Sequence, residues 1–564
     1  MPWLIADNGV RNPQRLRDGL EVLVNSEFHG DFSKKNEKGM ALLLDKEGII
    51  SLQTNTDNTV SRKWRLNLIR LGFINNETHT ITDNGRRLIH TSSLPEQEDC
   101  FLRALLIHQL PSPIHPMPWG DIDHPINPLR MVLSVLVGLE ELGQDSTISK
   151  NEMASIVMIH YNMTDIPHIV NEIIHYRKLK QKATGRVRQF EKEYREKASK
   201  IDGGRVSSES LNSYADVNIR YLKLTGLFEE EGISGLSIAE HKKTIVKQIL
   251  EIPFKPVSQE DYQRALGQGA SLPTDKKHEA ITAIRNLFDL LVQHNATIEP
   301  LPEGWEHMDI ADLSIIRIRL ENEWIHNQER QYAIRQKDEW EDILKYMTEL
   351  QQPSRIGKRN SLIPSGEGPA YLEWAVWRAF LAINSLHNEP WESRKFPVDR
   401  TFKPVRHAPS GDADMVFEFK DFVFVVEVTL TTSSRQEAAE GEPVRRHVAQ
   451  YVDKFSVLGK RVFGVFIANK IDTNTAETFR IGVWYRNDDS QMSVNIVPIT
   501  LEDFTKTFKT IFQDGFYENA EEFLKQLVIE LRSYSNERAP EWKLLIKESF
   551  ENRINYLSNL KSDK

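Results

Sequence analysis

Residues 411–430 read GDADMVFEFKDFVFVVEVTL. Two apolar runs flank the polar pair Lys420-Asp421, a pattern that predicts two β-strands joined by a tight turn. Side chains alternate between the two faces of a strand, so Val425, Glu427 and Thr429 share one face. Glu427 therefore lies within an otherwise apolar strand, where an unpaired carboxylate is energetically costly.

A metal ion would offset that cost. Asp414 opens the first strand, so the hairpin can bring it near Glu427. Two converging carboxylates suit Mg²⁺, which prefers oxygen ligands and can activate a water molecule for attack on a phosphodiester. The alternative is that Glu427 pairs with a buried arginine and Asp414 caps a turn, and the spacing alone does not separate the two. Asp412 is a rival to Asp414, because both precede the first strand.

Glu373 favours the metal site. It is the one acidic residue between Gly368 and Asn388, and it lies in a helix expected over residues 369–383 that is apolar on nearly every side. A buried helix should not retain a carboxylate without a partner. Arg378 is the alternative partner, but a separation of five residues is poor geometry on a helix. Glu373 is thus a candidate third metal ligand.

A charged segment follows the second strand, residues 435–443, and a helix is expected after it with Pro443 in its first turn. His447 borders the inner face of that helix. An inward histidine is usually a core residue, but beside a metal site it could contact a phosphate or a water molecule. Glu440 alone would be a solvated loop acid, and its neighbours make it a candidate for the site.

In the N-terminal part, residues 60–73 are expected to form a helix with an apolar stripe. Strand-like pieces follow at 73–74 and 79–82, and a turn signal at Asp83-Asn84-Gly85. A helix followed by a small β wing is the order of a winged-helix module. The helix carries four polar residues on the arc away from its stripe, as a recognition helix does toward the major groove. They are Arg62, Lys63, Asn67 and Arg70. A solvated charged face is the alternative interpretation.

A second basic signal is a run of lysines and arginines with no acidic residue between them. Such a run suits contacts to DNA phosphates, and a solvated helix end is an equal alternative. The run consists of Arg177, Lys178, Lys180, Lys182, Arg186 and Arg188.

The whole chain of 564 residues has a net charge of −9, which argues mildly against DNA binding. Only the DNA-facing surface must be basic, however, and the 50 residues 301–350 carry 12 acids against 6 bases. The single cysteine, Cys100, excludes an internal disulfide and a cysteine-rich zinc site. No secretory signal or membrane span is readable, so a cytoplasmic protein is expected.

These patterns predict a multidomain α+β protein. Residues 1–95 form a winged-helix subdomain, and residues 96–300 a second, mostly helical DNA-recognition subdomain. Residues 301–367 form a helical linker, and residues 368–564 an α/β domain.

At residues 411–451 the chain resembles the AlwI-type family of Type IIS restriction and nicking endonucleases. The resemblance is carried by Glu427-Val428-Thr429-Leu430-Thr431-Thr432 and by residues 435–447. Weaker similarity extends over residues 103–116 and over the helix at 61–73. It implies a PD-(D/E)xK-type nuclease fold with Asp414 and Glu427 as the motif acids. It also places Glu373, Glu440 and His447 in the site.

One position departs from the general nuclease pattern: the lysine expected two residues after the second acid is Thr429 here. Threonine cannot supply a positive charge, so the water-positioning role is unassigned, with His447 as the first candidate. The expected partner is double-stranded DNA, with Mg²⁺ as cofactor. A second copy of the chain or a small nuclease subunit would provide the second cut. The main alternative function is a non-catalytic winged-helix regulator, and another is a nuclease acting on RNA or branched DNA.

Overall fold

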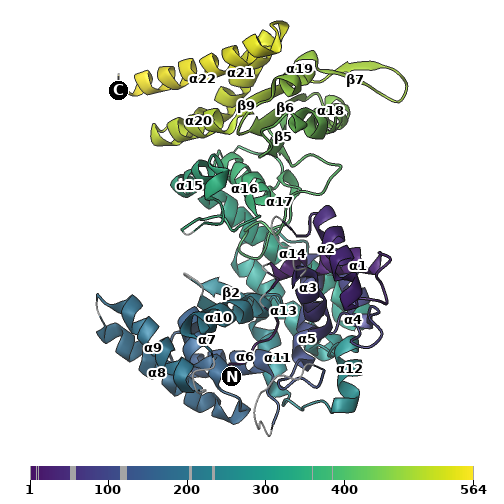
Figure 1. Cartoon of the computed structure of the whole chain (residues 1–564), viewed down its shortest axis with the longest axis vertical. Helices are drawn as coiled ribbons and strands as arrows, with labels where there is room; N and C mark the ends of the chain where they lie inside the picture. Colours follow the sequence, from purple (N-terminus) through teal and green to yellow (C-terminus); the bar gives the residue numbers. More distant parts are fainter. Residues whose placement is uncertain are drawn as a thin grey trace. The chain divides into compact units, whose positions relative to one another are not determined.

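The computed structural model describes residues 2–562, except positions 8, 11, 51, 53–58, 115–123, 184, 202–205, 232–234, 359 and 384. The chain divides into two compact units, Met1–Ile325 and His326–Lys564 (Figure 1). The finer division into four segments stays a prediction. No described helix combines the length and the apolar character needed to cross a membrane.

Unit 1 is mostly helical, and a continuous hydrophobic core runs from Trp3 to Ala283. A smaller core joins the last two helices through residues such as Leu291 and Trp324. The helices are α1 Leu16–Val24, α2 Glu37–Lys46, α3 Thr59–Arg70, α4 Asp83–Ile89, α5 Leu94–Ile107, α6 Pro128–Glu141, α7 Lys150–Ser155, α8 Ile166–Lys182, α9 Val187–Ile201, α10 Ser208–Lys223, α11 Lys243–Glu251, α12 Gln259–Gln268, α13 Lys277–Gln293 and the first part of α14, Ile310–Arg335.

A small antiparallel sheet interrupts these helices, and the sequence did not predict it. Its order is β1-β3-β2, formed by Thr147–Ser149, Gly235–Ile238 and Phe228–Glu231. Strands of three or four residues are too short to display a clear alternation of apolar and polar side chains.

The expected helix at 60–73 is confirmed as α3. The strand-like pieces after it form one isolated bridge, between Ile74 and Ile81. The prediction of a turn at residues 83–85 is wrong, because these residues begin α4. The Thr82 side chain accepts a hydrogen bond from the Gly85 backbone N–H, which is the geometry of a helix N-cap. The winged-helix assignment stays a prediction.

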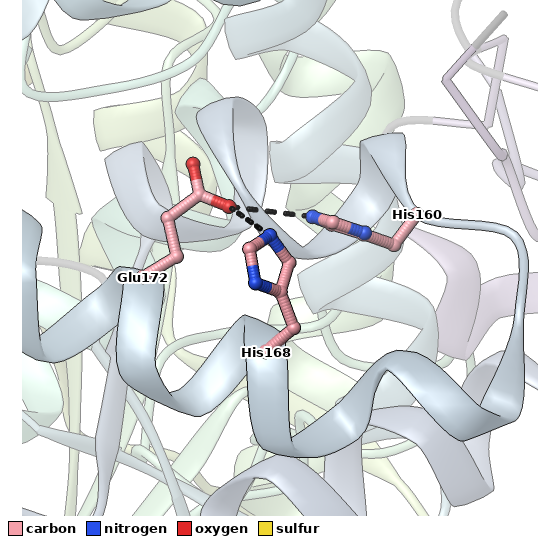
Figure 2. A group of neighbouring side chains, drawn as sticks. All are labelled: His160, His168 and Glu172. Carbon is pink, nitrogen blue, oxygen red and sulfur yellow. Dashed lines mark hydrogen bonds and ion pairs between the residues drawn. The ribbon is translucent and has the colours of Figure 1, made fainter.

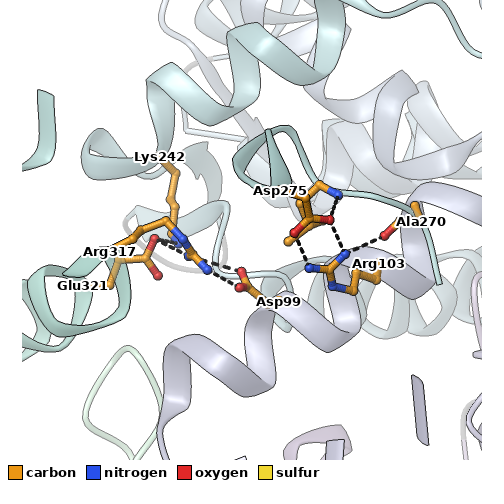
Figure 3. A network of polar contacts seen from close by, with 8 residues as sticks. Asp99, Arg103, Lys242, Ala270, Asp275, Arg317 and Glu321 are labelled. Atoms are coloured by element: carbon orange, nitrogen blue, oxygen red, sulfur yellow. Dashed lines mark hydrogen bonds and ion pairs between the residues drawn. The ribbon is translucent and has the colours of Figure 1, made fainter. Parts of the chain in front are cut away.

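A chain of ion pairs fixes the start of α14 within unit 1 (Figure 3). Arg317 binds Asp99 of α5 and Glu321, and Lys242 lies 2.7 Å from the same Glu321 carboxylate. Arg317, Lys242 and Glu321 are at most 4% exposed. Nearby, Arg103 of α5 makes a two-pronged contact with Asp275, with both distances 2.6 Å. Buried charges are tolerated because each has an opposite charge within contact distance.

Unit 2 contains a four-stranded mixed sheet, ordered β4-β5-β6-β9. The pairs β5/β6 and β6/β9 are parallel, and β4/β5 is antiparallel. A separate hairpin pairs β7 with β8. The elements after α14 are α15 Trp340–Leu350, α16 Gly368–Leu381, α17 Pro390–Ser393, β4 Met415–Glu418, β5 Phe422–Thr429, α18 Arg435–Ser456, β6 Arg461–Ala468, α19 Thr473–Ile481, β7 Val483–Tyr485, β8 Gln491–Ser493, β9 Ile496–Thr500, α20 Leu501–Gln513, α21 Ala520–Ser533 and α22 Ala539–Ser562.

Helices α16 and α18 cover opposite faces of this sheet. On one face, Phe380 of α16 stacks on Phe417 of β4, with ring centroids 4.1 Å apart. On the other face, α18 lies so close to β6 that a Cβ at Gly464 would be 2.7 Å from Val448. Gly464 is in register with Val425. The face that carries Val425 and Glu427 therefore looks toward α18.

Helix α18 begins at Arg435, so the expectation of a charged loop followed by a helix with Pro443 in its first turn is wrong. Pro443 lies inside the helix. The fully buried Gln436 holds the first turn in place, since its side chain donates to the carbonyls of Thr431 and Lys470 and accepts from the Asp472 backbone N–H. These anchoring contacts are tertiary, and they allow the helix to start despite the proline further along.

Candidate active site

Asp414 and Glu427 lie opposite each other at the end of the β4–β5 hairpin. The register pairs Met415 with Val426, so the next step along both strands places Asp414 across from Glu427 on the same face. Asp414 Oδ2 accepts a hydrogen bond of 2.8 Å from the Val428 backbone N–H. The hairpin thus brings the two carboxyl groups together, as expected from the sequence.

Glu373 enters the site from α16 and is 5% exposed. Its Oε2 accepts a 2.7 Å hydrogen bond from the Ala408 backbone N–H. Arg378, the alternative partner, instead donates to the side chains of Gln336, Glu339 and Asp342, all from α14, α15 or the turn between them. The buried carboxyl of Glu373 therefore has no ion pair with the arginine of its own helix.

The pKa values of all three acids are raised. Burial and the neighbouring Asp414 raise the pKa of Glu373 well above its ordinary value. Burial and Glu427 do the same to the pKa of Asp414. Burial, with contributions from Glu440 and Asp412, raises the pKa of Glu427 to about 8. Grouped carboxyl groups in a poorly solvated site resist full ionisation unless a cation joins them.

Two residues of α18 complete the group. His447 is 5% exposed, and its Nδ1 lies 2.7 Å from Glu427 Oε1. Burial and Arg446 lower the pKa of His447, which favours the neutral imidazole. Glu440 is seven residues earlier and so lies on the same helical face. Burial raises the pKa of Glu440, and a hydrogen bond with Thr429 opposes that rise.

Asp412 and Asp414, the two candidates for the first acid, have different neighbours. The Tyr451 hydroxyl of α18 donates to Asp412 Oδ1 at 2.8 Å, and Lys395 Nζ lies 3.8 Å from Asp412 Oδ2. Asp412 thus has partners of its own, whereas Asp414 faces Glu427. The sequence by itself marks neither Tyr451 nor Lys395 as a neighbour of Asp412, because both lie in segments distant along the chain.

The donors of this site fit a hard divalent cation. Three carboxyl groups offer only oxygen atoms, the ligands that Mg²⁺ prefers. The oxygen atoms of Glu373, Asp414 and Glu427 are not gathered within 4.8 Å of one another in this structure. Among the described residues, a group of potential metal ligands that does reach this spacing lies in unit 1. One oxygen of Glu373 accepts a hydrogen bond from the Ala408 backbone N–H, and one oxygen of Asp414 accepts from the Val428 backbone N–H.

The structure changes the set of residues available to DNA on α3. Arg62 is exposed and Lys63 is half-buried, with Nζ 4.0 Å from Asp7 Oδ1. Asn67 is fully buried, and its side-chain amide exchanges hydrogen bonds with the backbone N–H and carbonyl of Asp7. The Arg70 guanidinium is mostly buried, and that burial lowers its pKa. Asn67 therefore cannot contact a base in this conformation, because its amide is satisfied inside the core.

The basic run at residues 177–188 also contains both side chains held by acidic partners and side chains exposed to solvent. Arg177 donates to Glu152, which is 3% exposed, and to the carbonyls of Asp145 and Thr147. Lys180 forms an ion pair with Glu191 at 2.7 Å. Arg177 is therefore a structural cation, in contrast to the phosphate contact expected from the sequence. Exposed cations at the end of α8 and the start of α9 remain, namely Lys178, Lys182, Arg186 and Arg188.

Two comparisons concern solved structures and curated sequences. Similarity to solved structures includes the small subunit (R.BspD6I2) of the heterodimeric restriction endonuclease R.BspD6I. Identity is 24% and the TM-score 0.29, with 38% of this chain and 98% of that one covered. Similarity to the restriction endonuclease FokI has 13% identity and a TM-score of 0.25, covering 90% of this chain and 96% of that one. No curated protein sequence matches.

The family comparison covers most of the chain. The model of the AlwI restriction endonuclease family matches residues 69–507, which include α8 and every residue of the candidate active site but only the last two residues of α3. Restriction endonucleases are DNA hydrolases. The chain belongs to the AlwI restriction endonuclease family.

Proposed function

We propose that this protein is a Type IIS restriction endonuclease, or the strand-specific nicking subunit of one. It would hydrolyse phosphodiester bonds of double-stranded DNA a few bases outside a short asymmetric site. Unit 1 would recognise the site and unit 2 would cut. The observation that carries the proposal is the placement of Asp414 opposite Glu427 at the end of one hairpin, with the buried Glu373 beside them.

The cutting unit would be a PD-(D/E)xK-type nuclease that uses Mg²⁺. Asp414, Glu427 and Glu373 would hold the ion, which would activate a water molecule and stabilise negative charge on the phosphate. The carboxyl groups of this chain supply negative charge in a poorly solvated site. Their raised pKa values mean that binding the cation would release protons.

The lysine of the general nuclease pattern has no equivalent at Thr429, so another group must assist the attacking water. His447 is placed to do so, because its Nδ1 is held by Glu427 while the structure gives its buried Nε2 no hydrogen-bond partner. A neutral imidazole can accept a proton from water or donate a hydrogen bond to a phosphate oxygen. Glu440 lies two turns before His447 on the same face of α18, and it would keep negative charge beside the cation.

Incubation of supercoiled plasmid with and without Mg²⁺ tests the proposal. Discrete linear fragments that depend on Mg²⁺ would support restriction, and open circles would support nicking. Cutting at a fixed distance from one short sequence, mapped by sequencing the ends, would establish the Type IIS character. Cleavage within the recognised sequence would contradict it.

The same assay addresses the alternatives. A regulator would bind DNA and leave the plasmid intact, and membership of a restriction endonuclease family argues against it. A nuclease for RNA or branched DNA would leave plasmid intact but cut those substrates. Placing plasmid, RNA and a four-way junction in parallel reactions separates these outcomes.

A further inference from the structure

Two histidines and a glutamate meet in unit 1 at the beginning of α8 (Figure 2). His160 precedes the helix, and His168 and Glu172 lie one turn apart on it. Nε2 of His160 is 3.4 Å from Glu172 Oε2, and Nε2 of His168 is 4.0 Å from the same oxygen. All three potential ligand atoms lie within 4.8 Å of one another. This cluster takes no part in the site of unit 2.

The spacing is that of ligands around a small cation. Zinc binds histidine nitrogen and carboxylate oxygen at about 2.0–2.1 Å in a tetrahedral arrangement, which places two ligands roughly 3.3 Å apart. The His160–Glu172 separation of 3.4 Å is already at that value, and the His168–Glu172 separation of 4.0 Å exceeds it modestly. The His168 side chain is 72% exposed and can rotate by the small amount required.

The groups behind these ligands also match a metal site. Histidines that bind metals usually have a carboxylate or carbonyl at the second ring nitrogen, and ligating carboxylates are themselves hydrogen-bonded. Asp165 Oδ2 lies 3.5 Å from His160 Nδ1. The Tyr194 hydroxyl of α9 donates to Glu172 Oε1 at 3.2 Å. Two ligand side chains are thus oriented from behind, and the atoms facing each other are Nε2 of His160 and Oε2 of Glu172.

A simple ion-pair network explains the cluster less well. An exposed histidine 4.0 Å from a carboxylate contributes little to stability, so an ion pair alone is a weak reason for His168 to face Glu172. Two imidazoles and one carboxylate are a donor set that suits Zn²⁺ and its neighbours in the first transition row, in contrast to the all-oxygen set of unit 2.

We propose that His160, His168 and Glu172 bind one Zn²⁺ ion in unit 1, with water completing the coordination. The ion would join the segment before α8 to the helix itself, and through Tyr194 to α9. Its role is structural: it fixes α8 and α9, near whose junction the exposed cations Lys182 and Arg186 lie. The site is independent of cleavage chemistry in unit 2.

Titration of the full chain with Co²⁺ tests the proposal. Cobalt substitutes for zinc, and a site with two histidines in tetrahedral geometry gives visible absorption bands much stronger than an octahedral oxygen site. The titration is done in an Asp414→Asn background, which weakens cation binding in unit 2. We expect one equivalent of tetrahedral Co²⁺ that is displaced by an equivalent of Zn²⁺.

His168→Ala should abolish these bands, and it should not unfold the protein because the side chain is exposed. His175→Ala is the matched control, since His175 is an exposed histidine on the same helix and should leave the bands unchanged. Asp165→Asn and Tyr194→Phe should weaken Zn²⁺ binding about 10–100-fold by removing the supporting hydrogen bonds. Zn²⁺ should raise the Tm of the parent protein and of His175→Ala, and not of His168→Ala.

Two results would overturn the proposal. One is the absence of tetrahedral Co²⁺ from a His168-containing protein whose circular dichroism shows it to be folded. The other is a loss of the bands that is equal in His168→Ala and His175→Ala, which would indicate non-specific binding to surface histidines.

Discussion

His447 Nδ1 lies 2.7 Å from Glu427 Oε1, and this contact ties α18 to the strand that carries the second acid of the candidate site. Both side chains of this pair are buried. Burial raises the pKa of Glu427 and lowers that of His447, so in the absence of a cation the uncharged pair is favoured near neutral pH. Binding of Mg²⁺ would convert Glu427 to its carboxylate.

Glu427→Ala is expected to remove cleavage and to retain specific DNA binding. The carboxyl group lies at the proposed metal site in unit 2, while recognition is assigned to unit 1. Plasmid cleavage and gel-shift titration with the cognate duplex measure the two properties separately. A Glu427→Ala enzyme that cuts at the parent rate would remove Glu427 from the metal site.

The stability of the protein in EDTA is expected to fall as the pH rises from about 4.5 to about 8. Glu427 has a pKa of about 8 in the folded protein and an ordinary value of 4.5. A raised pKa contributes stability that is fully present below the ordinary value and is lost as pH rises through the folded value. The lowered pKa of His447 acts in the opposite direction, but it does so in both proteins compared below.

Urea unfolding of the parent and of Glu427→Gln at pH 5, 6, 7 and 8 tests this expectation. The glutamine is neutral at every pH, so the variant should show a shallower decrease in the free energy of unfolding. Identical pH profiles would mean that Glu427 titrates normally in the folded protein.

Arg62→Ala and Lys63→Ala on α3 are expected to weaken binding to the cognate site. A bidentate base contact would cost about 1–3 kcal/mol and alter sequence preference. A phosphate contact would weaken all sequences alike and reduce the salt dependence. Asn67→Ala should instead lower the free energy of unfolding, because it breaks the buried hydrogen bonds to Asp7. Unchanged affinity and sequence preference in both the Arg62→Ala and the Lys63→Ala variants would show that α3 does not recognise the site.

Arg317→Ala is expected to destabilise unit 1 by about 3–5 kcal/mol, because it removes the cation shared by the buried Glu321 and the partly buried Asp99. Arg319→Ala on the same helix is the control. Arg319 pairs with Glu299, whose side chain is 85% exposed, so its loss should cost about 1 kcal/mol or less. Denaturant unfolding monitored by tryptophan fluorescence compares the two, and equal effects would contradict the importance of the buried network.

Nicked plasmid is expected to be the first product at low enzyme concentration. The residues that the structure describes contain one candidate nuclease site, Glu373 with Asp414 and Glu427, and one such site cuts one strand in one orientation. Double-strand cutting would need a second copy or a small nuclease subunit. If the chain pairs with itself, linear product should rise more steeply than linearly with enzyme concentration. Double-strand breaks with a linear dependence and no nicked intermediate would contradict this prediction.

The sequence by itself determined the hairpin and its acids. The two apolar runs on either side of Lys420-Asp421 predicted both strands, and the hairpin brings Asp414 near Glu427 as expected. The isolation of Glu373 in an apolar helix predicted its burial, which is confirmed. The helical character expected for residues 301–367 is seen in α14 and α15. Local periodicity carries this information because burial on one side of an element selects residue type at a fixed spacing.

Only the tertiary structure decided which polar side chains are held by partners within the fold and which face solvent. Asn67 and Arg177 belong to basic or polar runs that look solvent-facing in the sequence, yet each is held by partners distant along the chain, at Asp7 and Glu152. The same holds for α18, which starts at Arg435 because Gln436 reaches loops at Thr431 and Lys470. Long-range hydrogen bonds leave no periodic signal, since the partner's position is set by how the chain folds back.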